Sequence, residues 1–237
     1  MRFPLLLALP ASLLLSGCIS HAPDADCAAN AMCAARAAEP AAIDDAHSLA
    51  RREGDDLILH PAGTAAITLT DHKAACDAGD TVQCQGFALM QFHRRAHALV
   101  VQRFLYEGSS FFLIDSVTGR QTQLSGMPIF SPDGQEFLVA PYDEETDTGP
   151  DNLEIWRRDG DGAALEWAHT IVQEHAEDPA LPVPYQTKVA DWSRDRIRLT
   201  FFIDHPDKHQ WSGGLTRTAD GWRLDAQSPS GSFTAAR

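Results

Sequence analysis

The sequence predicts an all-β fold made of short antiparallel strands. From about residue 55 onward, short runs rich in aliphatic, aromatic and β-branched residues are separated by Gly, Asp and Pro. One stretch, Phe130-Ser131-Pro132-Asp133-Gly134, places Pro, Asp and Gly between two extended runs and predicts a tight hairpin. No convincing amphipathic helix lies among these runs. Many short strands at even spacing are typical of sandwiches, barrels and propellers.

Residues 1–17 have the features of a lipoprotein signal peptide. The basic start Met1-Arg2 precedes an apolar run over 4–15, which is too short to span a membrane as a helix. The tetrad Leu15-Ser16-Gly17-Cys18 resembles the lipobox of bacterial lipoproteins. This resemblance implies cleavage before Cys18, acylation of that cysteine with palmitate among its acyl chains, and a periplasm-facing envelope protein, at the outer rather than the inner membrane. An ordinary secretory signal with a chance cysteine is the alternative.

The charge balance restricts the partners. The chain has 19 Lys and Arg against 33 Asp and Glu, a net charge of −14, and removing residues 1–17 deletes Arg2 and no acid. Such a surface repels phosphate backbones and anionic lipid headgroups. We therefore expect no nucleic acid partner, membrane contact through the lipid anchor only, and attraction to a basic protein. The alternative is that the charge serves solubility alone.

Cysteine usage indicates an oxidising compartment. After lipidation of Cys18, four cysteines remain, which is an even number. They allow three pairings, of which we favour the nearest-neighbour one, Cys27–Cys33 and Cys76–Cys84, because it closes two short loops. A zinc site is the rival interpretation, but the spacings differ from a Cys-x-x-Cys knuckle.

Residues 18–54 are expected to form a tether between the lipid and the folded domain, which we place at 55–237. The tether is rich in Ala and almost free of large apolar residues. Its helix propensity is high, so a partly helical tether is one possibility, but it offers no large side chains for a core face.

Within the domain, each strand is expected where a β-type run is bounded by turn residues. The expected strands are 57–59, 66–70, 87–92, 98–106, 110–114, 121–124, 136–140, 153–157, 165–169, 189–192, 197–203, 215–218 and 222–224.

The hairpin pattern recurs along the chain. The segment at Phe130 aligns with Trp192-Ser193-Arg194-Asp195 and with Phe92, and the other hairpins align on Gly63, Gly119, Gly160 and Gly221. A unit of about 40 residues with four strands has the size of a propeller blade. The sequence predicts a small β-propeller-like domain of about four blades, the first of them incomplete. The alternative is a curved antiparallel β-sandwich. We expect Phe92, Phe130 and Trp192 at equivalent buried positions in either case.

The segment at Phe130 and the segment 115–119 resemble the WD40-like repeats of bacterial TolB-type propellers. The resemblance covers about 57–224, and only one unit matches cleanly. The unit at Trp192 lacks the Pro and the Gly, and the unit at Phe92 keeps only the aromatic residue. The resemblance implies a propeller and a tendency to bind proteins, and it transfers no catalytic residue.

No sequence motif of an enzyme is present. The chain lacks a Gly-x-Ser-x-Gly elbow, a His-Glu-x-x-His motif, a phosphate-binding Gly loop and a dinucleotide fingerprint. We therefore expect a protein that is not an enzyme and name no catalytic residue or cofactor.

Two acidic clusters are candidate metal sites. Asp143, Glu145, Asp147 and Asp151 offer oxygens that suit Ca²⁺, although they lack the alternating order of a twelve-residue calcium loop. The segment 204–209 holds two His and two Asp that could bind a transition metal. Solvated loops explain both segments as well.

The one basic cluster is the segment 93–97, His-Arg-Arg-Ala-His. Strand-like runs flank it on both sides, so it is expected to be a hairpin turn and not a helix. Its positive charge could meet an acidic group of a partner, or it could be a plain exposed turn.

Three functions remain open at this point. The first is a non-enzymatic protein-binding lipoprotein of the envelope, for example an immunity or inhibitor protein against a periplasmic hydrolase. The second is a periplasmic hydrolase with a site built from loops, and the third is a structural lipoprotein of envelope assembly.

Overall fold

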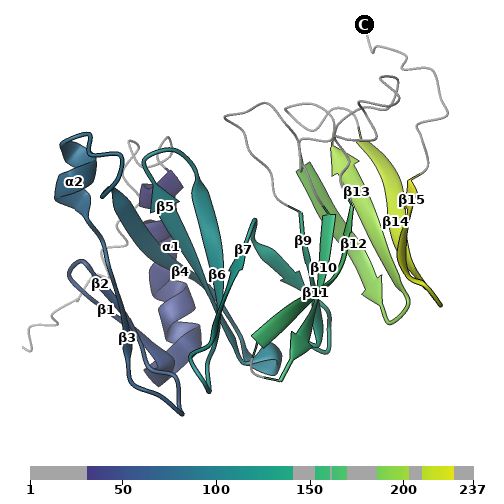
Figure 1. Ribbon diagram of the computed structural model, residues 1–237, viewed down its shortest axis with the longest axis horizontal. Coiled ribbons are helices and arrows are strands. Elements are labelled where there is room, and N and C mark those ends of the chain that lie inside the picture. Colours follow the sequence, from purple (N-terminus) through teal and green to yellow (C-terminus); the bar gives the residue numbers. More distant parts are fainter. Residues whose placement is uncertain (1–30, 141–152, 161, 170–185, 203–209, 227–237) are drawn as a thin grey trace, which may run out of the picture.

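The computed structural model describes residues 31–140, 153–160, 162–169, 186–202 and 210–226 (Figure 1). These residues are mostly β-structure, arranged in four antiparallel sheets, as the all-β prediction requires. In each sheet the strands are neighbours in chain order, so every sheet is a simple meander. Local hairpins of the predicted kind therefore build the fold.

The first two sheets contain seven strands. β1 (Ala50–Glu53), β2 (Asp56–Leu59) and β3 (Ile67–Thr70) form the first, three-stranded sheet. β4 (Gln85–His93), β5 (Ala98–Leu105), β6 (Ser109–Asp115) and β7 (Gln121–Leu124) form the second.

The last two sheets have four strands each. β8 (Pro128–Phe130), β9 (Glu136–Val139), β10 (Leu153–Asp159) and β11 (Gly162–His169) form the third sheet. β12 (Gln186–Ser193), β13 (Arg196–Phe202), β14 (Gln210–Thr218) and β15 (Gly221–Ala226) form the fourth.

Consecutive sheets pack face to face, with one hydrophobic core between each pair. Leu57 and Leu89 lie in the core between the first and second sheets. Val100 and Phe137 lie between the second and third, and Leu138 with Ile197 between the third and fourth. Because successive strand residues point to opposite faces, neighbours in one strand serve different cores. No core cluster of the described residues joins the first sheet to the fourth.

Charged contacts reinforce the packing between sheets. The Arg158 guanidinium in β10 donates to Asp115 at the end of β6, with Nη2 and Oδ2 2.5 Å apart and both side chains buried. Burial alone would raise the pKa of Asp115. The N–H groups of Thr118 and Val117, together with Arg158, outweigh burial and lower this pKa below its usual value. The carboxylate therefore stays ionised beside its arginine.

The hairpin at Phe130 has the predicted turn. Gly134 donates its backbone N–H to Ser131 O at 2.9 Å, and Gly134 has a φ of +74°. The Ser131 hydroxyl donates to the Asp133 carboxylate at 2.7 Å, and this bond is the largest cause of the lowered pKa of Asp133. The turn is thus closed by its own backbone and side chains.

The three aromatic residues that precede equivalent turns do occupy equivalent places, but they are half-buried and not fully buried. Phe92, Phe130 and Trp192 end β4, β8 and β12 near their turns, and each packs against a different core cluster. Each ring lies at the end of a sheet, where the turn leaves one side of it exposed.

The expectation that residues 18–54 form a tether outside the folded domain is wrong for the described part of this range, 31–54. Residues Ala31–Ala46 form helix α1, which packs along β4, and β1 follows it (Figure 1). Its buried face consists of Ala35, Glu39, Ala42 and Ala46. Small Ala side chains allow close approach of the helix to the sheet, so large apolar residues are not needed there. The segment that encloses the Cys76 loop also holds a short helix, α2 (Lys73–Asp77).

Candidate protein-binding surface

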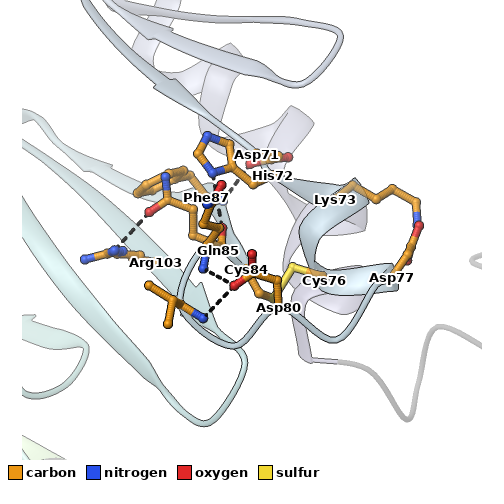
Figure 2. Close-up of a disulfide and its surroundings, with 12 residues drawn as sticks. Asp71, His72, Lys73, Cys76, Asp77, Asp80, Cys84, Gln85, Phe87 and Arg103 are labelled. Atoms are coloured by element: carbon orange, nitrogen blue, oxygen red, sulfur yellow. Dashed lines mark hydrogen bonds and ion pairs between the residues drawn. A yellow bond between two sulfur atoms is a disulfide. The ribbon is translucent and has the colours of Figure 1, made fainter.

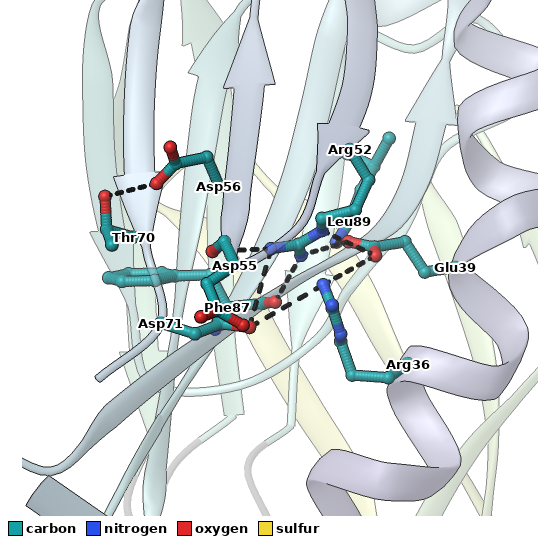
Figure 3. Close-up of polar contacts among 9 residues, drawn as sticks. All are labelled: Arg36, Glu39, Arg52, Asp55, Asp56, Thr70, Asp71, Phe87 and Leu89. Atoms are coloured by element: carbon teal, nitrogen blue, oxygen red, sulfur yellow. Dashed lines mark hydrogen bonds and ion pairs between the residues drawn. The ribbon is translucent and has the colours of Figure 1, made fainter. Parts of the chain in front are cut away.

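Strand β4 is an edge strand of the second sheet, and side chains instead of a neighbouring strand satisfy its free backbone groups (Figure 3). Phe87 donates its N–H to Asp71 Oδ1 at 2.7 Å, and Phe87 O accepts from Arg52 Nη2 at 2.6 Å. Leu89 donates its N–H to Glu39 Oε1 at 2.8 Å. Because the edge is paired in this way, it is not available for pairing with another strand.

The side chains on this edge form one ionic cluster, defined by Arg36, Glu39, Arg52 and Asp71. Glu39 is 3% exposed and accepts from Arg52 Nη2 at 2.7 Å and from Arg36 Nη1 at 2.9 Å. Asp71 Oδ2 lies 3.5 Å from Arg52 Nη1. Two acids and two arginines balance in charge, and each carboxylate has several partners. We therefore assign this cluster to structure and not to catalysis.

The same edge anchors the loop between β3 and β4. Directly after Asp71, His72 donates its backbone N–H to Gln85 O at 2.8 Å, and its ring Nδ1 lies 3.1 Å from Gln83 O. Cys76 and Cys84 are joined by a disulfide, which matches the pairing expected for these two cysteines (Figure 2). Both ends of the loop are thus fixed to the start of β4.

Within this loop, Asp80 shapes the turn that presents Val82. The Asp80 carboxylate accepts from the N–H groups of Val82 and Gln83 at 3.1 and 3.0 Å. Asp80 O accepts from Cys84 N at 2.8 Å. The Val82 side chain is 89% exposed, although the loop that carries it is held by a disulfide and by these bonds. A rigid loop with an exposed apolar tip is typical of a contact surface, because little order is lost on binding.

Two further exposed apolar residues lie beside this loop. Leu105 is paired with Gln85, the residue that follows Cys84, and Tyr106 follows at the β5–β6 turn. Leu105 is 38% exposed and Tyr106 is 50% exposed. The β5–β6 turn and α2 lie at the same end of the second sheet (Figure 1). We call Val82, Leu105 and Tyr106 the stapled-loop patch.

Charged groups of both signs border the stapled-loop patch. Asp77 and Asp80 lie in the loop itself, and exposed Glu107 follows Tyr106. Lys73 Nζ pairs with Asp77 at 2.8 Å, and Arg103 Nη2 donates to Gln85 Oε1 at 2.9 Å beside the loop. The rim thus keeps an excess of one acid around an apolar centre, which is the arrangement of a protein contact with a polar border.

The basic segment 93–97 forms a hairpin turn, as predicted, with a 3-10 turn at Arg94–Ala96. The His93 ring stacks on Phe130 with 4.2 Å between centroids, and its Nδ1 accepts from Ala96 N at 3.2 Å. Burial and the positive charge of Arg95 lower the pKa of His93. Arg95 itself donates to Pro132 O at 2.5 Å. The cluster therefore joins two turns of the fold.

Several predicted site residues lie outside the described residues. These are Cys18, Cys27, the calcium candidates Asp143, Glu145, Asp147 and Asp151, and the segment 204–209. Cys33 lies in α1, but its expected partner Cys27 is outside the described range. Within the described ranges, no group of three or more His, Cys, Asp or Glu side chains is arranged to hold a metal ion. None of the helices described is both long and apolar enough to cross a membrane.

The sequence predicted the Cys76–Cys84 loop but not what the loop presents. The signal lay in Asp80-Thr81-Val82-Gln83, where an aspartate precedes the backbone groups that it caps. An apolar residue inside a short polar loop closed by two cysteines could have been identified as a contact residue. Leu105 and Tyr106 extended the expected strand 98–106 and gave no separate signal.

No protein-family model matches this chain, and no curated protein is similar to it in sequence.

Proposed function

We propose that this protein is a non-enzymatic binding module that contacts another protein through the stapled-loop patch. The observation that carries the proposal is Val82, which is 89% exposed at the tip of a loop held by a disulfide. Exposed apolar side chains on a rigid, loop-borne surface are a recurrent feature of protein contact sites.

The proposed partner is an envelope or secreted protein with a basic surface. The net charge of −14 and the acidic rim around Val82 favour such a partner through electrostatic attraction. One specific form of this function is an immunity or inhibitor protein that blocks a periplasmic hydrolase, since a basic hydrolase would be attracted to this surface.

The proposed location is the periplasmic side of a bacterial envelope membrane, with the outer membrane favoured. The tetrad Leu15 to Cys18 supports it, because acylation of Cys18 would anchor the chain without a spanning helix. Replacement of Cys18 by Ser should leave the protein without an acyl chain and outside the membrane fraction. If the variant were still processed, acylated and membrane-bound, the proposed anchor would be wrong.

We further propose that the domain is propeller-like. Three four-stranded meanders with the same strand order, preceded by a three-stranded sheet, support about four blades with an incomplete first one. The curved sandwich is the alternative. A propeller-like arrangement is compatible with a loop-borne contact surface, since its turns gather at the ends of the sheets.

The test is affinity capture from envelope fractions with the lipidated protein and two matched variants. Val82→Asp places a charge in the stapled-loop patch, and Leu165→Asp makes the same change at a residue of β11 that is 50% exposed. We expect one protein to be captured in near-stoichiometric amounts by the wild type and by Leu165→Asp, and at least tenfold less by Val82→Asp. Equal capture by both variants would contradict the proposed surface. Hydrolytic activity without a captured protein would favour the hydrolase alternative.

A further inference from the structure

The face of the fourth sheet turned away from the third sheet is polar along most of β13 and ends at the buried Phe202. In β13, Ile197, Leu199 and Phe201 turn inward to the core shared with the third sheet. The alternating residues Arg196 and Arg198 turn outward and are exposed. This face is the end of the stack of sheets in Figure 1.

A glycine lies at the centre of this outer face. The strand register places Gly214 between Arg198 on one side and Asp225 on the other. Along β14, Ser212 and Thr216 are the next outward residues on either side of Gly214. Because Gly214 has no side chain, a hollow of about 280 Å³ opens here. Its polar lining consists of Arg196, Arg198, Thr200, Ser212 and Asp225, and Ala190, Leu199, Gly213 and Gly214 complete it.

The floor of the hollow is backbone. A Cβ atom at Gly214 would lie 3.0 Å from Ile197 O, which is tighter than ordinary packing. Gly213, the next residue of β14, pairs with the inward-facing Leu199, so Gly214 alone lacks a side chain on the outer face. Neighbouring side chains on such a face are about 5–7 Å apart, which is the scale of a single sugar ring or a small ligand group.

The groups around the hollow are donors and acceptors of several kinds. Asp225 accepts from Thr216 Oγ1 at 2.9 Å and from Arg223 Nε at 3.0 Å. Arg198 Nη2 lies 3.2 Å from Asp191 Oδ2. The hydrogen bonds from Thr216 and Arg223 lower the pKa of Asp225, and the positive charge of Arg196 adds to this effect. Cations thus outnumber acids on this face, although the whole chain has a net charge of −14.

We propose that this face binds an acidic saccharide, with its carboxylate at Arg196 and Arg198 and its hydroxyl groups at Asp225, Ser212 and Thr216. A guanidinium binds a carboxylate through two parallel hydrogen bonds, and the remaining lining groups exchange hydrogen bonds with hydroxyls. The hollow lies slightly below the usual 300–1,000 Å³ of ligand pockets, so one sugar unit would occupy it.

Other anionic polymers fit less well. An acidic polypeptide would use the arginines, but the lining residues offer it no deep apolar pocket for an anchor. A neutral saccharide would leave the guanidinium groups of Arg196 and Arg198 without a carboxylate to bind.

The experiment is calorimetric titration of the intact mature protein with trigalacturonate, an oligosaccharide of uronic acids. We compare the wild type with the double variant Arg196→Gln/Arg198→Gln. The matched control, Arg51→Gln/Arg157→Gln, removes the same two charges from other exposed strand positions. Maltotriose and polyglutamate serve as neutral and polypeptide ligands, and circular dichroism verifies the fold of each variant.

We expect trigalacturonate to bind the wild type and the control equally, and the Arg196/Arg198 variant at least tenfold more weakly. Maltotriose should give no heat of binding. In a parallel NMR titration, the amide signals of Gly213 and Gly214 should shift. Three results would overturn the proposal. They are no binding of trigalacturonate at about 10 mM, equal weakening in both double variants, or tighter binding of polyglutamate.

Discussion

The Glu39 carboxylate in α1 accepts a hydrogen bond from the backbone N–H of Leu89 in β4, at 2.8 Å. Glu39 thus supplies the hydrogen-bond acceptor that the carbonyl of a neighbouring strand supplies elsewhere in the sheet. Asp71 and Arg52 make equivalent bonds to Phe87. The ionic cluster thus closes the inner edge of the second sheet and also fixes the segment that leads into the stapled loop.

Replacement of Glu39 by Ala should destabilise the protein by about 3–5 kcal/mol, because it leaves Arg52 partly buried without its main acid and Leu89 N without an acceptor. Urea unfolding gives this value. The matched change is Glu53→Ala, which breaks the exposed pair with Arg51 and should cost about 0–1 kcal/mol. Similar losses in both variants would contradict the structural role of the cluster.

Gly134 is expected to tolerate a side chain less well than Gly160. Both have positive φ, +74° and +59°, so Ala adds backbone strain of about 1–2 kcal/mol at each position. Only at Gly134 would the new Cβ meet backbone, 2.9 Å from Ala96 N; at Gly160 nothing lies within 4 Å. Thermal unfolding should therefore show a clearly larger loss for Gly134→Ala than for Gly160→Ala. Equal losses would mean that the two turns do not pack closely.

Stability should fall as the pH drops below about 6.5, in part through His93. Burial and Arg95 lower the pKa of His93 in the folded protein, so the unfolded chain binds a proton more readily. Neutral His93 therefore contributes fully to the free energy of unfolding above its pKa in the unfolded chain. This contribution is lost as the pH falls toward the pKa of His93 in the folded protein. An NMR titration should give a pKa for His93 below 6.5, and His93→Gln should reduce the loss of stability between pH 7 and pH 5. A His93 pKa above 6.5 would contradict the stacked, neutral ring.

Removal of the Cys76–Cys84 disulfide should loosen the stapled loop. Loop-closure entropy for so short a loop predicts a loss of about 2–3 kcal/mol in unfolding free energy. The double variant Cys76→Ser/Cys84→Ser should remain folded, because the ionic cluster holds β4 independently. Hydrogen exchange should rise at Val82 and Gln83 and stay unchanged at Leu89. Unchanged exchange throughout the loop would mean that Asp80 alone fixes its shape.

The sequence was sufficient for the hairpins and insufficient for the helix. Pro132, Asp133 and Gly134 act within a few residues of one another, so their turn could be predicted locally. Helix α1 gains its place from contacts with β4, fifty residues away in the case of Glu39 and Leu89. An Ala-rich segment has the same composition whether it is a tether or a helix packed through its smallest side chains.

The candidate surface, too, could be predicted from the sequence only in part. The cysteine pairing follows from spacing and compartment, but the exposure of Val82 depends on the bonds of Asp80 and on the place of the loop beside Leu105. The hollow at Gly214 arises from the register of three strands, which brings Arg198 and Asp225 to either side of it. No local sequence pattern predicts that register.

If Val82 contacts a partner protein as proposed, photo-crosslinking in living cells should capture that partner. A photoreactive amino acid is introduced at position 82 and, in a separate strain, at position 165. We expect one discrete crosslinked species from position 82 and none from position 165, and this species should be lost when Tyr106 is changed to Asp. The proposal fails if position 82 gives no crosslink or if both positions give the same species.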